Sequence, residues 1–470
     1  MSTKTGSTEF ARRRRRDIVI AAAIALVAGV VAGTIYLTSD IRAVTSTEAP
    51  KTALPKNAAS APTSLKPLWT QPTDGTLGAV ASARGVVVTT DEHGLIGRDP
   101  ATGVQRWVYS RSNRDLCAVY SSDVTAGTQS SAGPGVRGII AIYRHGNLCQ
   151  EMVTLDPRTG ARLYQRTFSG QLDGTLISGG PYAGWLGHDL FDVWRNPLIR
   201  TRQYGNQPAS NEPNSARTGC TFLDAAITDR QFATVENCPQ LSFTLRLVLN
   251  WPDPGDPSQD KDNGGTVYTS KPRTDIDTGA TAARILGITP DRVAVLVNAP
   301  VTALVVYDAD GTVVSRTPTA APAGAFDTTG PTPRTTLDDV QYALLGTTLM
   351  ALTTANRTVK VTTTPTTTTT AELLPTGSSS AAPTVTDEER DTPALAWQRN
   401  GVIGLPGTVS GNVLIPTATG IDVANRIEGT TVRNLTVSRP NEPTRVDLRV
   451  IGSNLVELRG GQVAVYGIVR

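Results

Sequence analysis

The segment Gly94–Tyr109 has the sequence GLIGRDPATGVQRWVY, and Met152–Phe168 has the sequence MVTLDPRTGARLYQRTF. Both contain Asp-Pro-x-Thr-Gly, followed by an aromatic residue four positions after the Gly. Asp-Pro favours the start of a turn, and Gly takes a positive-φ position at its end. The segments are therefore two copies of one strand–turn–strand unit, whose aromatic side chain we expect to pack between units. The equivalent residues are Asp99, Gly103 and Trp107 in the first copy and Asp156, Gly160 and Tyr164 in the second.

Short β-branched runs continue along the chain from about residue 65, and no later stretch shows a helical period over several turns. Examples are GIIAIY at Gly138–Tyr143, RVAVLV at Arg292–Val297 and QVAVY at Gln462–Tyr466. Many short strands separated by turns indicate a sandwich, a barrel or a propeller. A length of roughly 400 residues is too large for one sandwich and matches seven or eight propeller blades of about 40–50 residues each.

The strand–turn–strand unit resembles the tryptophan-docking repeat of the quinoprotein-like β-propellers, a group that includes the BamB-type outer-membrane assembly lipoprotein. A weaker copy is Tyr307–Arg316 (YDADGTVVSR), and Gly420–Leu435 is a more diverged one. The resemblance extends over residues 65–470 and implies an all-β propeller. It is much less informative about function than about fold.

The expected blades can be counted from their outer strands. The C-terminal strands from Val446 to Val469 form the last blade, and Leu65–Gln71 supplies its outer strand, so that both edges are protected. This count favours eight blades, with seven as the alternative. The other outer strands are expected near Trp107, Arg166, Arg200, Arg246, Ser315, Trp397 and Leu435.

A basic cluster precedes an apolar run of 20 residues without charge, Ile18–Leu37 (IVIAAAIALVAGVVAGTIYL). A helix of this length spans about 30 Å, the thickness of the hydrocarbon core, whereas the apolar part of a cleaved signal peptide has only about 7–15 residues. We therefore expect an uncleaved signal anchor with one transmembrane helix. By the positive-inside rule the basic cluster stays in the cytoplasm and the body lies outside the plasma membrane. The cluster consists of Arg12, Arg13, Arg14, Arg15 and Arg16.

Residues 38–64 are rich in Ala, Pro, Ser and Thr and show no apolar periodicity, which predicts a flexible linker. Gly29 and Gly33 form a GxxxG pair that would let two membrane helices approach closely. Chance occurrence in a Gly/Ala/Val-rich helix is the alternative to dimerisation. The expected organisation is a cytoplasmic tail (1–17), a transmembrane anchor (18–37), a linker (38–64) and a propeller (65–470) with a low-complexity insertion at about 361–391.

The charge of the chain is concentrated at its start. The formal net charge is +3, but residues 1–17 hold six basic and two acidic residues, so the rest of the chain is nearly neutral. Such a body does not suit nucleic-acid binding. Only seven of the 44 basic residues are Lys, a bias typical of a GC-rich genome such as that of an actinobacterium.

The four cysteines are Cys117, Cys149, Cys220 and Cys238, all in the part expected outside the membrane, an oxidising location. Four cysteines allow three connectivities, of which we favour the two nearest-neighbour disulfides. Free thiols remain an alternative. A zinc site is a weaker one, because no C-x₂₋₄-C spacing occurs and the three histidines are scattered.

Two low-complexity segments interrupt the strands. Residues 362–370 (TTTPTTTTT), followed by residues 377–391, cannot build a core; they are a solvated spacer or a site for O-linked sugars. The acidic segment Trp251–Gly265 suggests Ca²⁺ binding. It fails the helix–loop–helix calcium pattern, because Lys271 stands where that pattern requires Glu, so we favour an exposed loop.

The sequence offers no convincing catalytic motif. It contains no P-loop, no Gly-x-Ser-x-Gly and no His-Glu-x-x-His. His188 stands near Asp189 and Asp192, but this pattern fits the polar edge of an aromatic hairpin better than acid–base or metal chemistry. The related quinoprotein dehydrogenases have adjacent, bridged cysteines and a calcium site, and this chain has no Cys-Cys pair.

These observations favour a membrane-anchored, extracytoplasmic propeller that acts as a protein-interaction or scaffold module in the cell envelope. Rigid blades that present loops suit recognition, and the partner would be an envelope protein or cell-wall glycan. The alternative is an exported quinoprotein oxidoreductase. We expect no catalytic residues, no cofactor and no metal, although enzymatic activity stays an open question.

Overall fold

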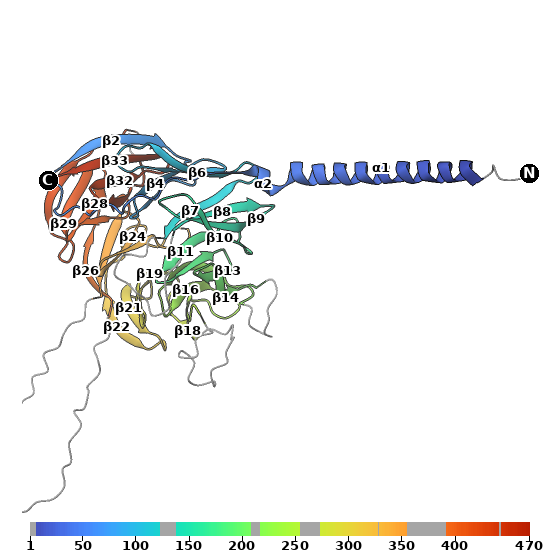
Figure 1. Cartoon of the computed structure of the whole chain (residues 1–470). Coiled ribbons are helices and arrows are strands. Elements are labelled where there is room, and N and C mark those ends of the chain that lie inside the picture. The colour runs from blue at the N-terminus through green and yellow to red at the C-terminus, as the bar shows by residue number, and fades with distance from the viewer. Residues whose placement is uncertain are drawn as a thin grey trace, which may run out of the picture.

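The structure, a computed structural model, describes residues 6–122, 138–207, 217–253, 273–327, 329–354, 392–440 and 443–470. Their strands form eight antiparallel sheets arranged as the blades of a closed ring (Figure 1). The all-β propeller is confirmed, and eight blades rather than seven are present. The outer strand of the last blade comes from the N-terminal part of the chain, as the sequence predicts.

The blades follow one another along the chain, and each is named here from its inner to its outer strand. Blade 1 has β3 (Val80–Ser82), β4 (Val86–Thr90), β5 (Gly94–Arg98) and β6 (Gln105–Arg111); blade 2 has β7 (Leu116–Ser122), β8 (Gly138–His145), β9 (Leu148–Leu155) and β10 (Arg162–Thr167); blade 3 has β11 (Thr175–Gly179), β12 (Tyr182–Leu186), β13 (Leu190–Arg195) and β14 (Ile199–Gly205); blade 4 has β15 (Thr221–Ile227), β16 (Phe232–Asn237), β17 (Arg246–Asn250) and β18 (Thr274–Asp277).

The second half of the ring repeats this order. Blade 5 has β19 (Ala283–Ile288), β20 (Arg292–Val297), β21 (Ala303–Asp308) and β22 (Val313–Pro318); blade 6 has β23 (Arg334–Leu337), β24 (Val340–Leu345), β25 (Thr348–Thr353) and β26 (Ala394–Arg399); blade 7 has β27 (Gly407–Val409), β28 (Asn412–Thr417), β29 (Gly420–Asn425) and β30 (Thr431–Thr436); blade 8 has β31 (Asp447–Ile451), β32 (Asn454–Leu458), β33 (Gln462–Val469) and β2 (Ser64–Pro72).

One expected outer strand was wrong. Arg246 lies on β17, the third strand of blade 4, and the outer strand is β18, whose sequence TDID is polar. The long connection between β17 and β18 displaces the outer strand from the position that an even spacing of blades predicts.

The N-terminal helix α1 (Gly6–Thr38) projects from the ring without packing on it (Figure 1). Among the described residues it is the one helix that is long and apolar enough to cross a membrane, and the apolar part is not buried inside the protein. It is followed at once by α2 (Asp40–Ala43) and by β1 (Val44–Thr47).

β1 pairs antiparallel with β6 and adds a fifth strand to blade 1, with Val44 opposite Arg111 and Thr47 opposite Val108. Part of the segment expected to be a flexible linker, residues 38–64, is therefore an edge strand of the propeller. The pairing uses backbone groups, which almost any composition supplies, so the Ala/Pro/Ser/Thr content did not reveal it.

The two faces of the ring can be assigned from the strand order. In a blade of four antiparallel strands, the connection from the outer strand to the next blade lies on the same face as the connection between the second and third strands. α2 is on this face, because Asp40 accepts hydrogen bonds from Asn113 Nδ2 (2.7 Å) and Arg114 Nη2 (2.9 Å) between β6 and β7. We call it the anchor face, and we call the other one the opposite face.

Residues 48–63 cross the opposite face instead of hanging free. The Ala49 N–H donates to the Thr159 carbonyl in blade 2 (2.9 Å), and the Ala58 N–H donates to the Gly452 carbonyl in blade 8 (3.1 Å). Ser410 Oγ in blade 7 donates to the Ala59 carbonyl (2.8 Å). The chain thus enters at the anchor face, runs along blade 1 as β1 and crosses the opposite face in contact with blades 2, 1, 8 and 7 before it closes the ring as β2.

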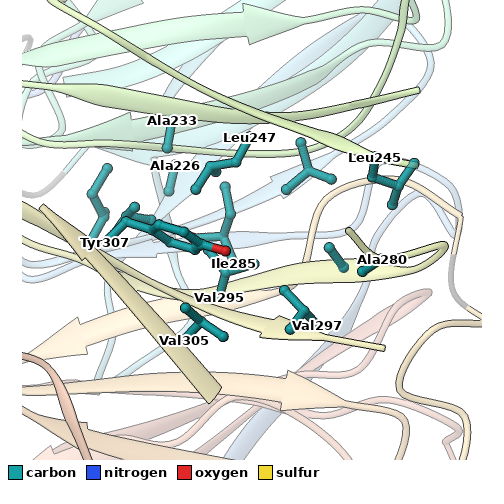
Figure 2. Close-up of a cluster of buried hydrophobic side chains, with 14 of the residues drawn as sticks. Ala226, Ala233, Leu245, Leu247, Ala280, Ile285, Val295, Val297, Val305 and Tyr307 are labelled. Carbon is teal, nitrogen blue, oxygen red and sulfur yellow. The ribbon is translucent and has the colours of Figure 1, made fainter. Parts of the chain in front are cut away.

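The core lies between neighbouring blades, because each sheet is covered on one face by the preceding blade and on the other face by the following blade. Between blades 4 and 5 small and branched side chains interdigitate around Tyr307, which is almost completely buried (Figure 2). This packing explains why the second and third strands are apolar on both faces, as in RVAVLV of β20, every residue of which except Arg292 is buried.

A buried carboxylate joins three consecutive blades near their inner strands. Asp224 on β15 accepts hydrogen bonds from the backbone N–H of Ile285 on β19 (2.9 Å) and of Thr332 before β23 (3.1 Å). Arg334 Nη1 also contacts this carboxylate, at 3.0 Å. Because the charge is fully paired, this group fixes the spacing of blades 4, 5 and 6 without an unpartnered buried ion.

The predicted insertion at about 361–391 and most of the acidic segment Trp251–Gly265 lie outside the described residues. By their flanking strands, they are connections between third and outer strands, in blades 6 and 4. The described part of the acidic segment makes protein contacts, since Asp253 accepts a hydrogen bond from Arg195 Nε at 3.1 Å.

Candidate functional site

Tryptophan side chains on outer strands dock onto the next blade. Each indole Nε1–H donates to a backbone carbonyl in the turn between the third and outer strands of that blade. Trp107 is completely buried by this contact. The donor and acceptor pairs are Trp69 with Pro100 (2.9 Å), Trp107 with Pro157 (2.9 Å) and Trp397 with Arg426 (3.0 Å).

The repeated turn is shaped to receive the ring. In the first copy the Asp99 carboxylate accepts the N–H groups of Ala101 and Thr102, both at 3.0 Å, and Gly103 has φ 72°. A Cβ at Gly103 would lie 2.8 Å from the Trp69 ring, so Gly is required by both backbone and space.

In the second copy Asp156 accepts the Arg158 N–H at 2.8 Å, and a Cβ at Gly160 would lie 2.7 Å from Trp107. Tyr164 takes the tryptophan position on β10 and is half-buried against the cluster that contains Leu198. The six residues singled out in the repeat thus lie in two of these turns, where Asp99 and Asp156 bind backbone N–H groups and Gly103 and Gly160 face a Trp ring, or on the outer strands that follow them.

Both disulfides have the nearest-neighbour pairing that the sequence favours. Cys117–Cys149 joins the first and third strands of blade 2, and Cys220–Cys238 joins the segments at the start of β15 and the end of β16. The quinoprotein dehydrogenases have a disulfide between two adjacent cysteines. Neither disulfide here joins adjacent residues.

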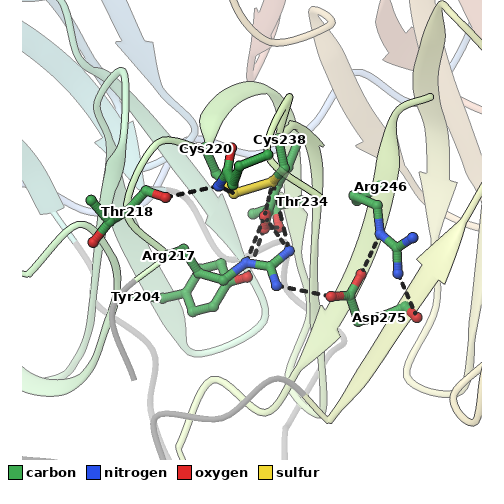
Figure 3. Close-up of a disulfide and its surroundings, with 10 residues drawn as sticks. Tyr204, Arg217, Thr218, Cys220, Thr234, Cys238, Arg246 and Asp275 are labelled. Carbon is green, nitrogen blue, oxygen red and sulfur yellow. Dashed lines mark hydrogen bonds and ion pairs between the residues drawn. A yellow bond between two sulfur atoms is a disulfide. The ribbon is translucent and has the colours of Figure 1, made fainter. Parts of the chain in front are cut away.

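A buried polar cluster lies beneath the second disulfide (Figure 3). Glu236 is completely buried and accepts hydrogen bonds from Thr234 Oγ1 (2.6 Å), Tyr204 Oη (2.7 Å) and Arg217 Nη2 (2.8 Å). Burial raises the pKa of the Glu236 carboxyl, and the charge of Arg217 offsets part of that rise. Arg217 also contacts Asp275 on the outer strand (2.8 Å), so the cluster connects the disulfide with the edge of blade 4.

The disulfide and this cluster hold the loop that follows Cys238 on the anchor face. The N–H groups of Leu241 and Ser242 both donate to the Cys238 carbonyl, at 2.9 and 3.1 Å. Ser242 Oγ donates to Asp277 at 3.1 Å, and Thr244 Oγ1 donates to the same carboxylate. The loop is therefore held by a covalent bond and several hydrogen bonds.

This immobilised loop carries large apolar side chains in solvent. Phe243 is fully exposed and Leu241 is 56% exposed. In blade 5, Val301 is 62% exposed in the connection between the second and third strands, on the same face. The two loops are linked by the segment between them, since the Thr278 N–H donates to the Leu245 carbonyl (3.1 Å) and the Asn298 N–H to the Ala282 carbonyl (2.8 Å). We call Leu241, Phe243 and Val301 the apolar patch.

An exposed aromatic side chain on a rigid loop is suited to protein recognition. Binding energy at interfaces is concentrated in a few aromatic or aliphatic anchors, and little conformational entropy is lost when the anchor is already ordered. Sequence reasoning missed this patch, because CPQLSFTL has no feature that separates an exposed Phe from a buried one.

The His188 cluster does not form an acid–base constellation in the part of the chain that the structure describes. The Asp189 carboxylate accepts hydrogen bonds from Gln171 Nε2 (2.6 Å) and Asn206 Nδ2 (2.9 Å). Asp192 is buried in blade 3 and accepts from Gln203 Nε2 (3.0 Å). Burial raises the pKa of Asp192 to about 6, although Arg200 and Gln203 act in the opposite direction. The two carboxylates thus have separate, structural partners.

The remaining predicted residues lie on α1. The side chains of Arg12, Arg13, Arg14, Arg15 and Arg16 are exposed. No atom outside α1 lies near Gly29 or Gly33, which leaves that side of the helix open.

Comparison with known proteins finds no matching family model and no matching curated protein. Solved structures with a similar fold include BamB from Moraxella catarrhalis, with 14% identity and a TM-score of 0.42 over 86% of this chain and 99% of that one. The Dos1 propeller has 8% identity and a TM-score of 0.47 over 86% and 95% of the two chains. The computationally designed Ika8 protein has 12% identity and a TM-score of 0.45 over 86% and 100%. The fold itself follows from the sheet order described above.

Proposed function

We propose that the protein is a membrane-anchored β-propeller of the cell envelope, and that it binds another envelope protein outside the cytoplasm through the apolar patch. The observation that carries the proposal is the direct connection of α1 to the propeller through α2 and β1. An apolar helix exposed on all sides is stable only where lipid or another apolar surface covers it.

The direction of insertion is part of this proposal. Five arginines precede the apolar segment, which favours a cytoplasmic N-terminus and places the propeller on the other side. Two disulfides in the propeller suit an oxidising compartment.

The partner is proposed to be a protein because the exposed groups of the patch are apolar. Cell-wall glycan would need many hydrogen-bonding groups, whereas the exposed side chains of Leu241, Phe243 and Val301 are apolar. The patch lies on blades 4 and 5, away from the blade that holds the anchor, so a partner has access to it.

Site-specific photocrosslinking in intact cells tests the proposal. Full-length protein with p-benzoylphenylalanine in place of Phe243 should give discrete protein adducts. The matched control carries the same probe in place of Val104, which is 63% exposed in a turn on the opposite face and should not give these adducts. Adding Leu241→Ser and Val301→Ser should weaken the adduct from position 243.

Equal adducts from positions 243 and 104 would show that the patch has no specific role. Adducts with glycan alone would replace the protein partner by a cell-wall ligand.

A further inference from the structure

The connection between α1 and the propeller leaves little slack, which brings one corner of the ring to the membrane. Asp40 is three residues beyond Leu37, and an extended chain spans at most about 3.3–3.6 Å per residue. Asp40 is therefore within about 10 Å of the hydrocarbon core if α1 spans the bilayer. The headgroup layer on each side is about 5–8 Å thick, so Asp40 lies within this layer or just outside it.

Side-chain contacts fix this short connection to blades 1 and 2. Asp40 binds Asn113 and Arg114, and Arg114 Nε also lies 3.1 Å from the buried Glu151 carboxylate on β9. The hydrogen bond from Arg114 and then that from Asn113 lower the pKa of Asp40, so it stays ionised. On the helix side, the Arg42 guanidinium lies over the Tyr36 ring, 5.3 Å from its centre.

The outer rim of blades 2 and 3 combines exposed arginines with exposed aliphatic side chains. α1 leaves the ring on the side where β9, β10 and β14 lie (Figure 1). Three exposed arginines there each have an exposed aliphatic residue near them in the sequence. Arg144 lies in the β8–β9 hairpin on the anchor face, where its N–H donates to the Asp115 carbonyl (2.8 Å), whereas Arg162 and Arg200 lie at the opposite-face ends of β10 and β14. The pairs are Arg144 with Leu148, Arg162 with Leu163, and Arg200 with Ile199; we call these six residues the basic edge.

The two outer strands of the basic edge, β10 and β14, carry no acidic residue. β10 has the sequence RLYQRT, and β14 has the sequence IRTRQYG. The carboxylates on the third strands that pair with them are buried: Glu151 on β9 is bound to Arg111 and Arg114, and Asp192 on β13 lies 3.8 Å from Arg200. Exposed cations that alternate with aliphatic side chains match a surface with anionic groups above hydrocarbon.

We propose that the basic edge of blades 2 and 3 rests on anionic lipid headgroups of the membrane that holds α1. This proposal depends on the anchoring proposed above and adds an orientation to it. The ring then stands with blades 2 and 3 toward the bilayer, and the apolar patch of blades 4 and 5 is displaced from the lipid surface. Arginine guanidinium groups bind lipid phosphates, and Leu148, Leu163 and Ile199 enter the interfacial layer.

Photocrosslinking in nanodiscs tests the orientation. Full-length protein with p-benzoylphenylalanine at Leu163 or Ile199 is placed in nanodiscs of phosphatidylcholine with or without 30% phosphatidylglycerol, and lipid adducts are measured by mass spectrometry. The control probe replaces Val314 on β22, which is 40% exposed against 41% for Leu163 and lies in blade 5. A probe at Ile24 inside α1 reports whether the helix is in lipid.

We expect lipid adducts at positions 163 and 199 in the anionic nanodiscs, and about fivefold fewer after Arg162→Glu with Arg200→Glu. Arg316→Glu, which removes an exposed arginine from β22, should leave them unchanged. Equal yields at positions 163 and 314, or no response to the arginine changes, would overturn the orientation. Adducts at position 24 without adducts at 163 would reject the basic edge and leave the anchor intact, whereas no adduct at position 24 would reject the anchor itself.

Discussion

Trp107 carries the junction between blades 1 and 2, because its ring is completely buried and its Nε1–H donates to Pro157. Trp107→Ala removes a large apolar side chain and leaves a cavity, so we expect the free energy of unfolding to fall by about 3–5 kcal/mol. Chemical denaturation of the full-length protein in detergent measures this loss.

Trp251→Ala is the matched control for that change. The Trp251 ring is only half-buried, and its described contact is with the Arg273 guanidinium at 5.1 Å, so a loss of about 1 kcal/mol or less is expected. Similar losses for the two variants would contradict the docking role of Trp107.

Asp192 should make stability depend on pH in a defined direction. Burial raises the pKa of this carboxyl from 3.8 to about 6, so the folded protein holds a proton that the unfolded chain releases. The favourable contribution is complete below about pH 4 and is lost as the pH rises to about 6. Asp192→Asn removes this titration and keeps a side chain of the same shape.

The free energy of unfolding of the Asp192→Asn variant, relative to that of the wild type, should therefore rise by up to about 3 kcal/mol from pH 4 to pH 7. Denaturant titrations at these two pH values give the difference. A difference that does not change with pH would mean that Asp192 is ionised in the folded protein throughout this range.

At the residue scale, the sequence predicted contacts that recur and missed contacts that occur once. Asp99 and Asp156 could be found because both stand in the same Asp-Pro-x-Thr-Gly turn. The corresponding turn Asn425–Gly429 has Asn in place of the Asp and shares only the Gly with that motif, so it was harder to find. The pair formed by Asp224 and Arg334 joins residues 110 positions apart with no repeated pattern. Nothing in the local sequence marks such a pair.

At the scale of elements, strands were predictable and the path of the N-terminal segment was not. Runs such as GVVVTT show their strand character directly, since buried strands need β-branched residues. Residues 48–63 are held mainly through backbone groups, which leave no compositional signal. The expectation of a flexible linker failed for this reason.

Digestion with trypsin tests whether residues 48–63 are held on the propeller or form a flexible linker, because the segment contains Lys51 and Lys56. Arg106 Nη2 donates to the Pro50 carbonyl (3.1 Å) and the Ala58 N–H is bound to Gly452, so the backbone on both sides is held. Cleavage of the native full-length protein at these lysines should be at least about tenfold slower than in the unfolded chain, because a local opening must precede it.

The buried Ala58 offers the matched variant for this digestion. Ala58→Arg should release the segment and restore rapid cleavage, whereas Ala59→Arg, at an exposed neighbouring position, should not. If the native wild type is cleaved as fast as the unfolded chain, residues 48–63 are a flexible linker, as the sequence predicts.

At the scale of the whole molecule, helix α1 runs directly into the propeller through α2 and β1. α1 continues into a strand of blade 1, and the chain then supports blades 2, 8 and 7 before it closes the ring. The account accordingly predicts that the ring has a fixed position relative to the membrane. The sequence predicted the ring and the apolar helix separately, because their connection depends on contacts between distant residues such as Asp40 and Arg114.

The claim on which the account depends most is that α1 holds the propeller on the outer side of a membrane. Intact cells treated with a membrane-impermeant amine-reactive biotin test it, because Lys56 and Lys66 belong to the propeller and Lys4 precedes the apolar segment. The account predicts biotin on Lys56 and Lys66 in intact cells and on Lys4 only after permeabilisation. Biotin on Lys4 in intact cells, or none on Lys56 and Lys66 until the cells are permeabilised, would contradict it.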